Sequence, residues 1–346
     1  MKINREDLNW AVDRKILSNE QASTLWDAFQ NRDRDKPKFI LGHVIYYFGA
    51  MIIISAMGWF VSNAWEVLGG GGICGVALLY ALFFGIIGYS LWKTPAFKIP
   101  GGLLLTAAVW MAPLIIYGFQ RMMGWWPQGD PGAFPGYHVW VKGSWAAMEV
   151  GTILAGIVVL KWIRFPFLTF PIAFSLWYMS MDLTPLLFGK VDFTWDERKM
   201  VSMWFGLAIL FVTYVVDRKT KDDFAFWGYL FGLIAFWGGL SMMESTSELN
   251  KFIYCLINIG LILLSVFLSR RAFAVFGALG VSGYLEHLAH EVFKDSLLFP
   301  VALSSIGLLI IFLGVQFQKN EKRIEVAHET RLPERLRKLR PVHRVS

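Results

Sequence analysis

Charged residues are scarce in this sequence of 346 residues. Asp, Glu, Lys and Arg make up 17% of the chain, whereas soluble globular domains contain about 25%. Hydrophobic residues make up 55%, and many stand in runs of about 20, the length that crosses a hydrocarbon core of about 30 Å as a helix. A soluble fold could not bury so many helices that are apolar on all sides. The scarcity of charge therefore excludes an ordinary soluble protein and predicts a membrane protein.

Cysteines are few, and familiar catalytic motifs are missing. Cys74 and Cys255 lie inside apolar segments and are interpreted as small core residues rather than as a disulfide. We find no P-loop, GxSxG, HExxH or CxxC motif, so ATP-driven transport by this chain alone is not expected. The sequence predicts no catalytic residue, no metal and no cofactor. The net charge of +7 follows membrane topology, so no nucleic-acid partner is expected.

The apolar runs predict an all-α fold, a polytopic transmembrane helix bundle of about ten spans. The spans are expected near residues 40–62, 71–92, 100–119, 145–163, 166–188, 199–216, 223–243, 250–269, 272–290 and 296–318. With the N-terminus inside, 26 of the 33 Lys and Arg residues fall on the cytoplasmic side, as the positive-inside rule requires. We therefore expect both termini in the cytoplasm, a polar preface at 1–38, the bundle at 39–318 and a basic tail at 319–346.

Both polar ends of the chain offer contact surfaces. Ser18 and Gln21 form a capping box, which predicts two short amphipathic helices in the preface. This preface is expected to stabilise the cytoplasmic face or to bind a protein partner. The tail predicts a basic amphipathic helix that contacts anionic lipid; an equally weighted alternative is that its charges only fix the topology. Its lipid-contact candidates are Arg331, Arg335, Arg337, Lys338 and Arg340.

Ionisable groups inside a bilayer are costly, so each one is a candidate functional group. Most of these groups fall near the predicted outer ends of the spans, and Glu149 lies deepest among the carboxylates. For the segment from Glu286 to Glu291, three alternatives stay open, namely metal binding, proton or cation transfer, and plain interfacial polarity. The candidates for a proton or substrate site are Glu149, Asp182, Glu244, Glu286, His287 and His290.

Two segments of the sequence carry a family resemblance. One is the polar preface from Trp10 to Phe29 with the following run from Gly42 to Gly49, and the other is the segment from Leu332 to Pro341. Together they resemble the bacterial multi-spanning membrane proteins grouped as domain of unknown function twenty-one fifty-seven. The resemblance implies a multi-pass protein of the bacterial inner membrane and supplies no catalytic residues.

Three functions are weighed from these features. The first is a transporter or permease-like protein with a polar site towards the outer face. The spans interrupted by Gly and Pro and the carboxylates near the outer face favour it. The alternative is a non-catalytic membrane scaffold or accessory subunit that binds lipid or a protein partner through the preface and the tail. The third, an intramembrane enzyme that uses the segment from Glu286 to Glu291, has the weakest support, so enzymatic activity is not expected.

Overall fold

The computed structural model describes residues 5–33, 41–126, 144–188, 195–220, 222–243, 245 and 247–292, and six positions between 301 and 312. The tenth expected span has only those six positions described, and the basic tail lies outside the described residues. The described part is helical and contains no strand. The chain divides into two compact units, residues 1–53 and residues 54–346.

The first unit contains a helical hairpin. Helix α1 (Arg5–Asp13) is followed by α2 (Asn19–Asp33), and Leu8 and Ala22 are the buried apolar residues of the pair. The Gln21 N–H donates to Ser18 Oγ at 3.1 Å, and the Ser18 N–H donates to Gln21 Oε1 at 3.0 Å. The predicted capping box is confirmed, because each side chain satisfies a backbone donor at the start of α2.

Helix α3 (Leu41–Trp92) covers the first two expected spans, and it begins in the first unit with most of its length in the second. Its regular geometry is interrupted at Gly69, where φ is 58° and ψ is −177°. A side chain is strained at such a positive φ, so glycine suits this position. The break lies within the glycine run 69–72, between the first two expected spans.

The third expected span is divided into two helices. Helix α4 (Lys98–Trp110) follows the short helix η1 (Pro95–Phe97), and α5 (Ala112–Met122) begins after Met111. Pro113 lies in the first turn of α5, a position where a missing backbone N–H costs little. The proline therefore accounts for the boundary between α4 and α5 while both helices continue the same apolar segment.

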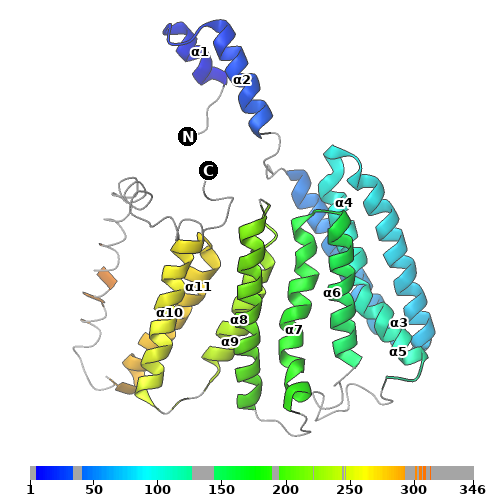
Figure 1. The fold of residues 1–346 in the computed structure, drawn as a ribbon. Coiled ribbons are helices and arrows are strands. Elements are labelled where there is room, and N and C mark those ends of the chain that lie inside the picture. The colour runs from blue at the N-terminus through cyan, green and yellow to red at the C-terminus, as the bar shows by residue number, and fades with distance from the viewer. Residues whose placement is uncertain are drawn as a thin grey trace. The chain divides into compact units, whose positions relative to one another are not determined.

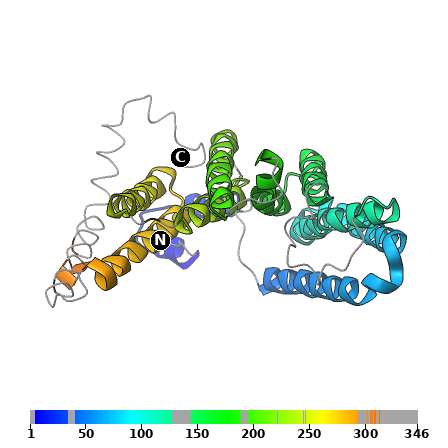
Figure 2. The same ribbon diagram turned by 90° about the horizontal axis from the view of Figure 1, so that it is seen from below.

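The next four helices pack side by side, as Figures 1 and 2 show. They are α6 (Ser144–Trp162), α7 (Thr169–Phe188), α8 (Trp195–Lys219) and α9 (Phe226–Ser241), with the short helix η3 (Pro166–Leu168) before α7. Aromatic rings join α7 to α9: the Phe170 and Trp227 centroids are 4.6 Å apart, and those of Phe174 and Phe231 are 5.7 Å apart. Such ring pairs stabilise packing beyond the area that they bury.

The last described helices form a core with α9. Helix α10 (Glu248–Leu268) packs against α11 (Arg271–His287), which continues into the π-helix η4 (Leu288–Val292). The buried cluster is centred on Tyr229, Leu233, Leu261 and Phe273. This core fixes the ends of α9, α10 and α11 relative to one another, and the polar residues considered below lie at those ends.

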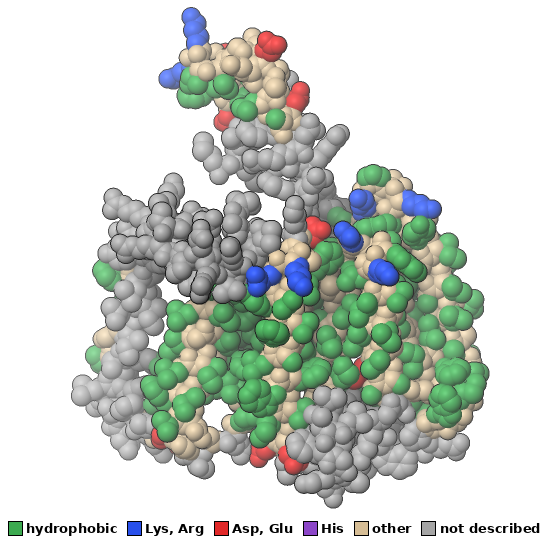
Figure 3. All heavy atoms as spheres, viewed as in Figure 1, with side chains coloured by type: hydrophobic (Ala, Val, Ile, Leu, Met, Phe, Trp, Pro, Cys, Tyr) green, Lys and Arg blue, Asp and Glu red, His purple; other side chains and the backbone are tan. Residues whose placement is uncertain are grey.

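The exterior of the helices is apolar, which identifies the surrounding solvent as lipid. Large side chains such as Leu79, Ile86, Phe211 and Leu263 are exposed, and Figure 3 shows hydrophobic side chains covering the helices below an end where Lys and Arg gather. Five described segments are long and apolar enough to cross a membrane: Val67–Trp92, Pro95–Met122, Trp145–Trp162, Trp195–Lys219 and Glu248–Leu268. The predicted all-α membrane helix bundle is confirmed, and the number of ten spans stays a prediction.

Candidate functional site

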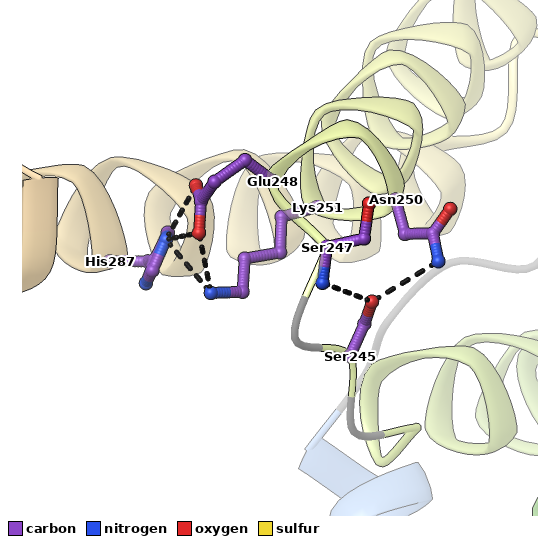
Figure 4. Close-up of polar contacts among 6 residues, drawn as sticks. All are labelled: Ser245, Ser247, Glu248, Asn250, Lys251 and His287. Atoms are coloured by element: carbon purple, nitrogen blue, oxygen red, sulfur yellow. Dashed lines mark hydrogen bonds and ion pairs between the residues drawn. The ribbon is translucent and has the colours of Figure 1, made fainter.

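A charged cluster joins the start of α10 to the end of α11 (Figure 4). Lys251 Nζ lies 2.8 Å from Glu248 Oε1, one turn along α10. His287, the last residue of α11, places its Nε2 atom 3.1 Å from Glu248 Oε2 and 3.2 Å from Lys251 Nζ. Glu248 stands in the first turn of α10, where the partial positive charge of the helix N-terminus favours a carboxylate.

The imidazole of His287 has two ways to bond within this cluster. When Nε2 carries no proton, it accepts a hydrogen bond from the Lys251 ammonium group at 3.2 Å. When the ring is protonated, the Nε2–H group donates to Glu248 instead. Protonation of His287 therefore exchanges the hydrogen bond with Lys251 for one with Glu248. It also adds one positive charge to a cluster that otherwise holds one Glu and one Lys.

The same cluster borders a polar pocket. The cavity has a volume of about 570 Å³ and lies between the end of α9, the start of α10 and the end of α11. Ser245 Oγ accepts hydrogen bonds from the Ser247 N–H and from Asn250 Nδ2, each at 3.2 Å (Figure 4). The polar residues of its lining are Ser241, Ser245, Asn250, Lys251, Tyr254, Tyr284 and His287. A volume of this size falls within the range of small-molecule sites, about 300–1,000 Å³.

Asn258 connects the three helices below this pocket. Its side chain is fully buried; Trp237 Nε1 of α9 donates to its Oδ1 at 3.0 Å, and its Nδ2 donates to the Tyr254 carbonyl at 2.8 Å. A Cβ atom on Gly280 of α11 would lie 2.0 Å from Asn258 Oδ1. Asn258 therefore holds α9, α10 and α11 together, a role that a buried amide in a membrane helix commonly has.

Glu149 lies away from the pocket, on the face of α6 that packs against α7. The ring of Trp145 stacks on Tyr178 of α7 at 5.6 Å, and a Cβ atom on Gly156 would lie 2.6 Å from Ile172 of α7. Residues 145, 149 and 156 share one face at helical spacing, so Glu149 lies between these two contacts. Its side chain is buried, at 6% exposure, and its depth in the bilayer stays a prediction.

Within the described structure, none of the other predicted candidates is seen beside the pocket or beside Glu149. Glu286 is exposed on α11 and is not part of the pocket lining. The backbones of Asp182 and His290 lie in α7 and η4, but their side chains lie outside the described residues, as do Glu244 and the tail residues Arg331, Arg335, Arg337, Lys338 and Arg340. Helix α6 packs on α4, α5 and α7, whereas α11 packs on α9 and α10. Figures 1 and 2 accordingly show α6, which carries Glu149, apart from α11, which carries His287.

A buried ion pair at the other end of these helices is not foreseen by sequence reasoning. Arg270, between α10 and α11, contacts Asp217 of α8 through Nη2 and Oδ1 at 2.6 Å and through Nε and Oδ2 at 3.4 Å. Its Nη1 atom lies 2.7 Å from Asp223 Oδ1, and its guanidinium lies over the ring of Tyr229. Asp217 is 0% exposed and Arg270 is 7% exposed.

The charges around Arg270 hold its guanidinium in the ionised form. Burial alone would lower the pKa of Arg270, but the hydrogen bond with Asp217 and the nearby charges of Asp223 and Asp217 outweigh burial, so the pKa is raised. The one available signal in the sequence was Asp217 directly after an apolar run. From the charge pattern alone, Arg270 is one of the cations that indicate the cytoplasmic side of the membrane.

Comparison with known proteins finds a family match for the first third of the chain. Residues 9–121 match the family model described as Predicted membrane protein (DUF2157). A search of curated proteins and a search of solved structures each find no match. The matched region ends before Glu149 and before the pocket, and the segment from Leu332 to Pro341 lies outside it. The resemblance expected from the sequence is thereby confirmed over residues 9–121, where this membrane protein is similar to the DUF2157 family.

Proposed function

We propose that this protein is a permease-like transporter that binds a small anionic solute in the pocket between α9, α10 and α11 and takes up a proton at His287. The observation that carries the proposal is the pocket itself. It brings an ammonium group, an imidazole, hydroxyls and an amide together between helices that are otherwise apolar. Ionisable residues of membrane helices that face a cavity often mark solute pathways.

The cluster offers a physical reason for coupling. With His287 neutral, the charges of Glu248 and Lys251 balance, and the imidazole accepts from Lys251. With His287 protonated, the cluster has one excess positive charge, which an anionic group of the solute can compensate. Binding of the solute and binding of the proton then favour each other, because each is stronger when the other is present.

We further propose that the protein lies in a bacterial inner membrane with both termini in the cytoplasm and the pocket towards the outer face. The support for this orientation is the bias of Lys and Arg along the sequence and their gathering at one end of the helices in Figure 3. The positive-inside rule assigns that end to the cytoplasm. The N-terminal end of α10, where Glu248 lies, then faces outwards.

The test is proton uptake into proteoliposomes that contain a trapped pH dye. Succinate, glutamate and inorganic phosphate are added separately as probes to wild-type protein, to His287→Gln and to Glu286→Gln, the matched control one residue away. We expect uptake with at least one probe, a decrease of about tenfold or more in His287→Gln, and no change in the control. Absence of uptake with all three probes, or equal uptake by His287→Gln and wild type, contradicts the proposal.

A further inference from the structure

A larger groove lies between α6, α7, α8 and α9, away from the polar pocket. Its volume is about 1010 Å³, at the upper end of the range for small-molecule sites, about 300–1,000 Å³. Its walls are apolar along most of their length and include Ile153, Ile157, Leu160, Ile172, Leu176 and Phe205. A groove of this kind suits hydrocarbon chains rather than a polar solute.

One end of the groove is charged. Arg164, two residues after α6, and Lys219, the last residue of α8, both line it and are exposed. Asp222, also exposed, lies beside them. The hydroxyls of Thr169 and Thr220 line the same end but donate to the carbonyls of Pro166 and Val216. The two cations are therefore the groups at this end of the groove that can hold an anion.

The open side of the groove faces the hydrocarbon. Ile157, Val212 and Val216 line the groove and are also exposed, at 50%, 60% and 38%. Transfer of apolar surface from water to an apolar medium is favourable, so this open side is more stable against lipid than against water. A ligand with hydrocarbon chains, such as a phospholipid, can therefore enter the groove from the bilayer.

We propose that the groove binds one anionic phospholipid of the phosphatidylglycerol type, taken from the leaflet at its charged end. Its phosphate contacts Arg164 and Lys219, the glycerol hydroxyls of its headgroup donate to Asp222, and its acyl chains lie along the apolar walls. The single negative charge of this lipid balances the excess positive charge of the three residues. The charged end lies where Lys and Arg gather (Figure 3), which the positive-inside rule assigns to the cytoplasmic leaflet, rich in anionic lipid. This inference does not depend on the proposed transport function.

Native mass spectrometry of the full chain in detergent tests the headgroup contacts. The protein is titrated with dioleoylphosphatidylglycerol or with dioleoylphosphatidylcholine. We expect one tightly bound phosphatidylglycerol. Its affinity should fall by about fivefold for each cation removed, hence by about twenty-five-fold in Arg164→Gln/Lys219→Gln. Lys161→Gln, an exposed cation in the last turn of α6 that does not line the groove, is the matched control and should bind as wild type. Equal affinity for the two lipids, or an unchanged affinity in the double variant, overturns the proposal.

A second pair of variants tests the position of the acyl chains. Ala208 lines the groove and is exposed, so Ala208→Trp fills the space without entering the protein core. Ala147→Trp adds the same side chain at an exposed position of α6 outside the groove. We expect Ala208→Trp alone to weaken phosphatidylglycerol binding. Equal binding by the two tryptophan variants, or complete displacement of the lipid by millimolar glycerol phosphate, overturns the assignment of the chains to this groove.

Discussion

Removal of the Arg270 guanidinium should destabilise the protein more than removal of either of its carboxylate partners. In Arg270→Gln, the Asp217 carboxylate remains at 0% exposure without its cation. An uncompensated buried charge of this kind costs about 3–5 kcal/mol of the free energy of unfolding. In Asp217→Asn the guanidinium keeps Asp223 at 2.7 Å, so we expect a cost at the lower end, about 3 kcal/mol. In Asp223→Asn a half-exposed partner is lost, and we expect about 1 kcal/mol or less.

The matched control for Arg270→Gln is Arg271→Gln. Both positions lie at the N-terminus of α11, where a cation is disfavoured by the helix dipole, so loss of either charge is slightly stabilising by that effect alone. Arg271 is exposed, and the free energy of unfolding of its variant should equal that of wild type or be slightly larger. The difference between the two variants therefore measures the ion pair and not the helix terminus.

Equilibrium unfolding in mixed micelles, followed by tryptophan fluorescence, provides the measurement. Asp217→Leu/Arg270→Met removes both charges and should recover most of the stability, because an apolar pair avoids the cost of burying charges. The order Arg270→Gln, Asp217→Asn, Asp223→Asn from largest to smallest loss is the expected result. If Arg270→Gln costs no more than Arg271→Gln, or if the double variant loses the sum of both single losses, the reasoning from burial is refuted.

Three further variants test other parts of the account. Gly280→Ala should destabilise the protein by about 1–3 kcal/mol because its Cβ would lie 2.0 Å from Asn258 Oδ1, whereas Gly283→Ala, which meets open space, should be neutral or slightly stabilising in the same unfolding assay. Glu149→Gln should keep the fold but decrease proton uptake by about tenfold or more if the carboxylate carries a proton, and uptake equal to wild type in proteoliposomes would remove that role. Ser18→Ala should destabilise α2 by about 1 kcal/mol through loss of the capping box, visible as decreased helicity in circular dichroism of a 1–38 peptide compared with Ser23→Ala.

Features set by neighbouring residues were predictable from the sequence. The ends of α6, α8 and α10 fall close to the expected spans because hydrophobicity along the chain determines where a membrane helix runs. The capping box at Ser18 and Gln21 is likewise local, since its two bonds join residues three positions apart. The break at Gly69 is also a local feature, because glycine accepts a positive φ that other residues avoid.

Features that depend on packing between distant helices were not predictable. Asp217 and Arg270 are 53 positions apart, and nothing in either segment specifies the other as its partner. The sequence identifies His287 as a candidate, but its partners Lys251 and Glu248 lie on α10, 36 and 39 positions away. The groove between α6 and α9 arises only when four helices pack, so its charged end at Arg164 and Lys219 has no counterpart in a single sequence motif.

If lipid surrounds these helices, α10 crosses the bilayer and its two ends lie on opposite sides. Single cysteines at Leu249 and Arg271, exposed positions at or just beyond opposite ends of α10, test it directly in a background where the two free cysteines Cys74 and Cys255 are replaced by alanine. A membrane-impermeant maleimide added to intact spheroplasts should label Leu249→Cys and should label Arg271→Cys only after the membrane is permeabilised. Labelling of both positions from the same side contradicts the account.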